Sequence, residues 1–150
     1  LSAAAEVGYY WMEPTIGSRE KEDGVTFKAD ITQLDAYTTY RLSVQGGYTQ
    51  DLFTSQNLGF RKYYRATGSI THFLDRRLSI GCQGSVERVE SEADQRDTIW
   101  GAGANISYLP LRWLQVTLGY AYQQDNTNYR YEAENEYKEN RVMLSFTATY

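Results

Sequence analysis

The sequence predicts an all-β fold of antiparallel strands, and three observations lead to this prediction. Tyrosine is the dominant aromatic residue, with 14 copies in 150 residues, whereas proline occurs only twice. Tyr, Thr and Val favour strands, and good helix formers do not recur at helical spacing anywhere in the chain. Several segments alternate apolar and polar residues with a period of two, the pattern of a strand with one apolar face. The length is about that of one domain, so we expect a single domain over 1–150.

An internal repeat organises the strands into hairpins. The tripeptides Leu42-Ser43-Val44, Leu78-Ser79-Ile80 and Leu114-Gln115-Val116 recur at a spacing of 36 residues. A period of this size indicates a repeated supersecondary unit, here a strand, a short turn, a second strand and a long polar connection. The repeat and the alternation together predict eight strands, which we expect at 1–12, 24–33, 37–49, 58–72, 76–90, 98–109, 112–124 and 137–150.

The connections between these strands are of two kinds. The sequence is strand-like from Leu1 onward. Three later pairs of strands are joined by tight turns, at Leu34-Asp35, Phe73–Asp75 and Leu109–Leu111. Pro110 is expected in the last of these turns, where a proline removes no ladder hydrogen bond. The remaining connections, 13–23, 50–57, 91–97 and 125–136, are longer and carry most of the acidic and amide residues. Short turns at one end and long polar loops at the other are typical of an outer-membrane β-barrel.

The polar faces of the later strands indicate a lumen wall. On strands 98–109 and 112–124 this face consists of Gly101, Gly103, Asn105, Ser107, Gln115, Thr117, Gly119 and Ala121. A face turned to bulk water usually carries Lys and Glu, and this one does not. Aromatic residues collect at both ends of the strands, at Tyr9, Trp11, Tyr48, Tyr120 and Tyr122 near the long connections and at Tyr37, Tyr40, Tyr108 and Trp113 near the short turns. Two such belts are typical of a membrane barrel.

These features predict an antiparallel up-and-down transmembrane β-barrel with about eight strands in this chain. Hydrocarbon cannot hydrogen-bond a free strand edge, so the sheet must close on itself. Eight strands leave an interior that side chains can just fill. The alternatives are a tyrosine-rich soluble β-protein and a lipocalin-like barrel with an apolar lumen, which would be soluble without detergent.

Charged residues are predicted on the inward face. They are Lys28, Asp30, Arg41, Arg61, Arg65, Arg77 and Glu87. Centring the hairpins on Leu34–Tyr37 and on Leu74 would pair Asp30 with Arg41, Arg61 with Glu87, and Arg65 with Gln83. Such charges either fill the interior as partnered structural groups, or the four arginines form a basic stripe that favours anions.

Other classes of function find little support. The net charge of −4 argues against a nucleic-acid surface. Cys82 is the only cysteine, which excludes an internal disulfide and a multi-cysteine metal site. Ser69 and His72 lack an acid that would orient the imidazole, so a hydrolase triad is not expected. We therefore expect no enzyme, no metal and no cofactor. The acidic segments "ERVESEADQRD" and "YRYEAENEY" are expected to be solvated loops rather than sites that bridge divalent cations to lipid headgroups.

Three segments carry a family resemblance: "SITHFLDRRLSIGCQGS", "SYLPLRWLQVTLGYAYQQ" and "YKENRVMLSFTATY". They resemble the C-terminal hairpins of Gram-negative outer-membrane proteins of the beta-barrel porin 2 type. In such families the barrel-assembly machinery reads the last strand, so the resemblance implies an assembly signal at Val142, Leu144, Phe146, Ala148 and Tyr150. Members of the family are typically larger than 150 residues, so the resemblance implies either that this chain is the C-terminal part of a larger barrel or that it is a compact relative.

Two functions remain as expectations. The first is porin-like passive diffusion of small hydrophilic solutes. The second is a small closed eight-stranded barrel that anchors or displays adhesin-like loops without a pore. Either would be a multi-pass protein of the outer membrane, with long loops extracellular and both termini periplasmic. Its partners would be outer-membrane lipid, lipopolysaccharide and the assembly machinery, with no nucleic acid. The oligomeric state stays open.

Overall fold

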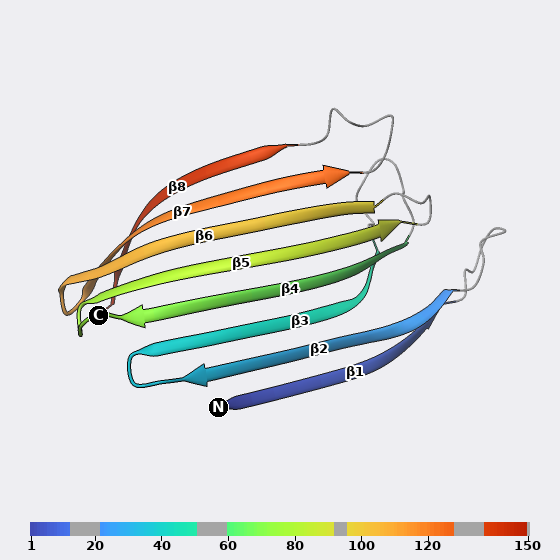
Figure 1. Ribbon diagram of the computed structural model, residues 1–150, viewed down its shortest axis with the longest axis horizontal. Coiled ribbons are helices and arrows are strands. Elements are labelled where there is room, and N and C mark those ends of the chain that lie inside the picture. The colour runs from blue at the N-terminus through green and yellow to red at the C-terminus, as the bar shows by residue number, and fades with distance from the viewer. Residues whose placement is uncertain (13–21, 51–59, 92–95, 128–136, 150) are drawn as a thin grey trace.

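The computed structural model describes residues 1–12, 22–50, 60–91, 96–127 and 137–149. This part of the chain forms one antiparallel sheet whose eight strands follow chain order (Figure 1). The strands are β1 (Ser2–Met12), β2 (Glu22–Leu34), β3 (Thr38–Gln50), β4 (Phe60–Phe73), β5 (Leu78–Ser91), β6 (Arg96–Leu111), β7 (Leu114–Thr127) and β8 (Lys138–Ala148). All eight predicted strands and the up-and-down order are confirmed, and the strand ends differ from the prediction by no more than three residues.

The sheet is a single curved layer with two open edges. Each strand pairs only with its neighbours in sequence, so β1 and β8 form the edges and are not paired with each other. Figure 1 shows the layer bending, with β8 curling round behind the other strands. The short turns lie together at one end of the strands, and the long connections leave from the other. We call these the short-turn end and the long-connection end.

The sheet has no hydrophobic core. Among the described residues no hydrophobic side chain is buried, and Trp11, Val142 and Phe146 are 73%, 71% and 65% exposed. In a water-soluble domain a sheet with one apolar face must bury that face against a second layer. Within the described ranges no second layer covers the apolar face, which suits a non-aqueous environment.

The short turns are held by backbone and aspartate hydrogen bonds. The Asp75 carboxylate accepts hydrogen bonds from the backbone N–H groups of Arg77 and Leu78, at 2.5 and 2.8 Å, the local pattern that makes Asp a frequent turn residue. Neighbouring turns are also joined: Phe73 N–H donates to the Tyr37 carbonyl at 2.8 Å, and Leu109 N–H donates to the Arg77 carbonyl at 2.8 Å.

Two local predictions at this end are wrong. Pro110 lies inside β6 rather than in a turn, at the register shift between Tyr108 and Leu111. Because proline has no N–H to donate, an irregular point near a strand end accommodates it. Arg77 belongs to the connection before β5, which begins at Leu78, and is therefore outside the strands.

The predicted cross-strand pairs are also wrong, although the predicted faces are not. Asp30 pairs with Ser43 rather than with Arg41. Arg65 pairs with Glu87 rather than with Gln83, and Arg61 pairs with Ser91. The aspartate-capped turn places the centre of the β4–β5 hairpin two residues later than Leu74, and such a displacement changes each partner by four residues. An even change leaves every side chain on its original face.

Two glycines on one face allow a matched test of the packing. A Cβ at Gly46 would lie 2.5 Å from Phe27 Cε1 and 2.9 Å from Tyr64 Cδ1, whereas nothing lies within 4 Å of a Cβ at Gly68. We therefore expect Gly46→Val to lower the free energy of unfolding by about 1–3 kcal/mol through overpacking. Gly68→Val should leave it unchanged or raise it slightly. Urea unfolding of the refolded protein in vesicles measures both, and equal effects would contradict the packing of the two rings over Gly46.

Candidate functional site: the polar face of the sheet

Cross-strand pairing sorts the strand residues into two faces. The polar face carries Lys28, Asp30, Arg41, Arg61, Arg65 and Glu87, together with Thr67, Ser69, Gln83, Ser85, Gly101, Gly103, Gly119, Ala121, Glu139 and Arg141. The apolar face carries the alternate residues. Of the charged residues predicted to face inward, those that lie in strands share the polar face, and Arg77 alone lies outside the strands.

The charges on the polar face are mostly paired. Arg65 donates to Glu87 Oε2 from both Nε and Nη2, at 3.0 and 2.8 Å. Lys28 Nζ lies 3.3 Å from Asp30 Oδ2. On β8, Arg141 Nη2 lies 2.5 Å from Glu139 Oε1. All of these side chains retain solvent exposure, so each pair adds little to stability. The pairs instead neutralise part of the polar face.

Sequence reasoning missed the charged residues on the polar face of β8. Arg141 and Glu139 were not among the predicted inward charges, although counting back by twos from Ser145 assigns both to that face. Both residues lie on β8, the strand for which the predicted assembly signal included only the apolar residues. Tyr150, the last residue of that predicted signal, lies outside the described residues.

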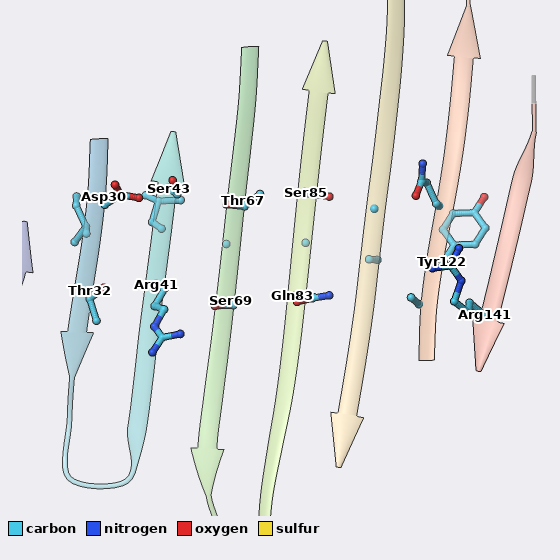
Figure 2. A pocket seen from close by; sticks show the side chains of 18 of the residues that line it. Asp30, Thr32, Arg41, Ser43, Thr67, Ser69, Gln83, Ser85, Tyr122 and Arg141 are labelled. Carbon is cyan, nitrogen blue, oxygen red and sulfur yellow. The ribbon is translucent and has the colours of Figure 1, made fainter. Parts of the chain in front are cut away.

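The polar face encloses a hollow of about 480 Å³. Figure 2 shows the side chains that line it, contributed by strands from β2 to β8. Its polar lining consists of Asp30, Thr32, Arg41, Ser43, Thr67, Ser69, Gln83, Ser85, Gln123, Glu139 and Arg141. Gly101 and Ala121 contribute a flat stretch on β6 and β7. Hydroxyl, amide and ionic groups of this kind suit water and hydrophilic solutes.

The apolar face has the geometry of strands tilted in a bilayer. Residues that are paired from strand to strand form rows across the sheet. The row that starts with Ala5, inside β1, ends with Lys138, the first residue of β8. Conversely, the row that ends with Leu144, inside β8, starts with Thr38, the first residue of β3. The apolar band therefore crosses the strands diagonally. A horizontal hydrocarbon layer produces this pattern when the strands of a barrel tilt against its axis.

Tyrosines on the apolar face turn their hydroxyl groups toward the long-connection end. Tyr9 donates to Asp23, Tyr120 donates to Asn140 at 2.6 Å, and Tyr122 donates to Gln124 at 2.8 Å. An aromatic body in apolar surroundings with a polar tip in a wet layer is the arrangement of a membrane-interface tyrosine.

The other predicted belt residues are distributed as follows. Trp11, Tyr40 and Tyr108 lie on the apolar face, and Trp113 lies in the turn before β7. Tyr48 lies near the end of β3, with its ring centroid 4.6 Å from that of Tyr10. Tyr64 and Trp100 also lie on the apolar face and are exposed, although the prediction did not include them. Counting by twos along β4 and β6 would have included both.

Other candidate sites are absent from the described part of the chain. Ser69 and His72 fall on opposite faces of β4, and His72 Nδ1 lies 2.8 Å from Thr38 Oγ1. Cys82 is a free cysteine on the apolar face. Within the described ranges there is no group of three or more His, Cys, Asp or Glu that could hold a metal ion. In the same ranges, no helix is long and apolar enough to cross a membrane. The central parts of the acidic connections lie outside them.

Comparison with known proteins adds a family to this geometry. A family model described as "Putative beta-barrel porin 2" matches residues 2–150. Searches of curated proteins and of solved structures gave no match. The match covers nearly the whole chain and agrees with the antiparallel up-and-down sheet, its polar hollow and its exposed apolar face. The chain therefore belongs to the putative beta-barrel porin 2 family of outer-membrane β-barrel proteins.

Proposed function

We propose that this protein forms a water-filled pore for passive diffusion of small hydrophilic solutes across the outer membrane. The observation that carries the proposal is the polar hollow of about 480 Å³, which extends across strands from β2 to β8. Between the arginines at its two sides, Arg41 and Arg141, the lining on β4, β5 and β6 consists of small or neutral residues such as Ser69, Gln83 and Gly101, which leave space open. A barrel of only eight strands has room for little beyond its own side chains, so this lining suits a wider barrel.

The open edges support the same proposal. β1 and β8 each have one side without a strand partner in the described sheet. In a bilayer such an edge would leave backbone N–H and C=O groups unsatisfied, at several kcal/mol for each group. We propose that further strands pair with β1 and β8 and complete a barrel larger than these eight strands. The described sheet is then one part of the wall, and its polar face lines the channel.

The unequal connections suggest an orientation. Short turns in such barrels face the periplasm and long loops face the outside, so we propose that the long-connection end is extracellular and that the short-turn end is periplasmic. The proposed partners are outer-membrane lipid along the apolar face, lipopolysaccharide at the long-connection end, and the barrel-assembly machinery during biogenesis. Passive diffusion through this pore requires neither nucleic acid nor a catalytic group.

Reconstitution into liposomes tests the pore. Vesicles that contain the purified protein should swell in isotonic solutions of small sugars, and the rate should fall as the size of the sugar increases. Heat-modifiable migration on a gel verifies that the barrel is folded. A folded protein whose vesicles swell no faster than protein-free ones would refute the pore and favour a closed anchoring barrel.

A further inference from the structure

Arg41 differs from the other positively charged strand residues of the polar face, which are Lys28, Arg61, Arg65 and Arg141. It lies on β3 and lines the hollow, and Figure 2 shows it level with Ser69 on β4. Among the described residues no ion pair or side-chain hydrogen bond engages its guanidinium group, whereas Arg65 and Arg141 each contact a glutamate. Asp30, the nearest acidic group on β2, is itself paired with Lys28 at 3.3 Å. Arg41 therefore contributes a positive charge that no neighbour in the described strands offsets.

The neighbours of Arg41 are neutral hydrogen-bonding groups. Arg41 pairs with Thr32 on β2 and with Ser69 on β4, and Ser69 pairs in turn with Gln83 on β5. Directly paired side chains on one face have Cβ atoms about 4.5–5.5 Å apart. A small anion that contacts the guanidinium can therefore also reach the Ser69 hydroxyl.

Beyond Gln83 the row of paired residues that contains Arg41 continues through positions with small side chains. It passes through Gly103 and Ala121, which have no long side chains, and ends with Arg141 on β8. This part of the row leaves room for a solute beside Ser69 and Gln83. Arg141, at the far end of the row, already forms an ion pair with Glu139. Arg41 should therefore attract a negatively charged group more strongly than Arg141 does.

We propose that Arg41, Ser69 and Gln83 form a binding site for solutes with an oxyanion group, a carboxylate or a phosphate, within the proposed channel. A guanidinium group presents parallel N–H donors that match the two oxygens of a carboxylate or phosphate. A serine hydroxyl and an amide complete the hydrogen bonding of such a group. This site would give the proposed pore a preferred class of solute. Its role in transport therefore rests on the proposed pore.

Reversal potentials in planar bilayers under a KCl gradient measure the effect of the charge. The wild-type protein should favour anions, and Arg41→Gln should lower the anion-to-cation permeability ratio by about 25-fold. One unit charge about 4 Å away in water attracts an anion about fivefold and disfavours a cation about fivefold, and the ratio combines both effects. Arg112→Gln removes the same charge from the turn between β6 and β7 and should leave the ratio unchanged. Equal ratios for wild type and Arg41→Gln would overturn the proposal.

A binding measurement separates this proposal from the pore. Inorganic phosphate and acetate are added separately to the detergent-solubilised protein, and broadening of their ³¹P and ¹³C resonances reports binding without any current. Broadening should be strong for the wild type, weaker for Arg41→Lys, which keeps the charge but loses the guanidinium geometry, and absent for Arg41→Gln. Comparison of the two probes identifies the preferred oxyanion. Broadening that does not depend on Arg41 refutes the site even if the channel conducts, whereas a wild type that binds but does not conduct refutes only the pore.

Discussion

Arginine introduced at Ala66 should severely destabilise the barrel, whereas arginine introduced one residue later, at Thr67, should be tolerated. Ala66 lies on the apolar face of β4, between Val44 on β3 and Val86 on β5. It also lies within the apolar stretch of that strand, two residues from Tyr64 and four from Ile70. An arginine facing lipid near the bilayer midplane costs about 2–4 kcal/mol of folding free energy in a membrane barrel.

Thr67 provides a matched control. It lies on the polar face between Ser43 and Ser85, beside the hollow. A new arginine there remains in water, so we expect a change of less than about 0.5 kcal/mol, as for an ordinary exposed substitution. Urea unfolding of each variant refolded in phosphatidylcholine vesicles measures the difference. A larger loss for Thr67→Arg than for Ala66→Arg would mean that the two faces have been assigned the wrong way round.

Replacing Phe146 should reduce the amount of assembled barrel in cells. Phe146 lies on the apolar face of β8, opposite Val116 on β7, and is 65% exposed. Phe146→Ser removes an apolar side chain that lipid would cover, so the free energy of unfolding should fall by about 1.5–3 kcal/mol. If β8 is also the proposed assembly signal, the heat-modifiable protein in the outer membrane should fall far more than this loss of stability explains.

Val116→Ser separates the two effects because Val116 contacts the same lipid layer but lies outside the last strand. Val116→Ser should lower the free energy of unfolding in vesicles, as Phe146→Ser does. The amount of assembled barrel in cells should fall much less for Val116→Ser than for Phe146→Ser. Thr147→Ser, on the polar face of β8 opposite Gln115, should change neither quantity. Equal cellular levels for Phe146→Ser and Val116→Ser would show that stability alone sets the amount assembled.

The two faces of this sheet were predictable because side chains alternate strictly along a strand. The alternation from Leu114 to Tyr122 and from Val142 to Ala148 assigned each of these residues to a face without knowledge of any partner. The predicted turn centres were displaced by one residue between β2 and β3 and by two between β4 and β5. Both displacements changed the partners by an even number, so Arg65, Glu87 and Arg41 stayed on the predicted face.

The partners themselves could not be predicted in this way. The position of a hairpin depends on hydrogen bonds within the turn, such as those from Arg77 and Leu78 to Asp75, and composition does not reveal which of several polar residues will accept them. The supposed basic stripe illustrates the consequence. Register pairs Arg65 with Glu87, and the start of β5 leaves Arg77 outside the strands. Of the four arginines, Arg41 is the one that combines a place in the hollow with a guanidinium group left unengaged by the described residues.

The sequence by itself determined the number and order of the strands, the polar and apolar faces and the membrane environment, because these depend on local periodicity and on the lengths of the connections. Only the tertiary structure decided which charges meet, that a hollow crosses strands from β2 to β8, and that β1 and β8 remain apart. Those properties depend on the register between strands and on the curvature of the whole sheet, and both arise from hydrogen bonds between segments that no single stretch of sequence contains.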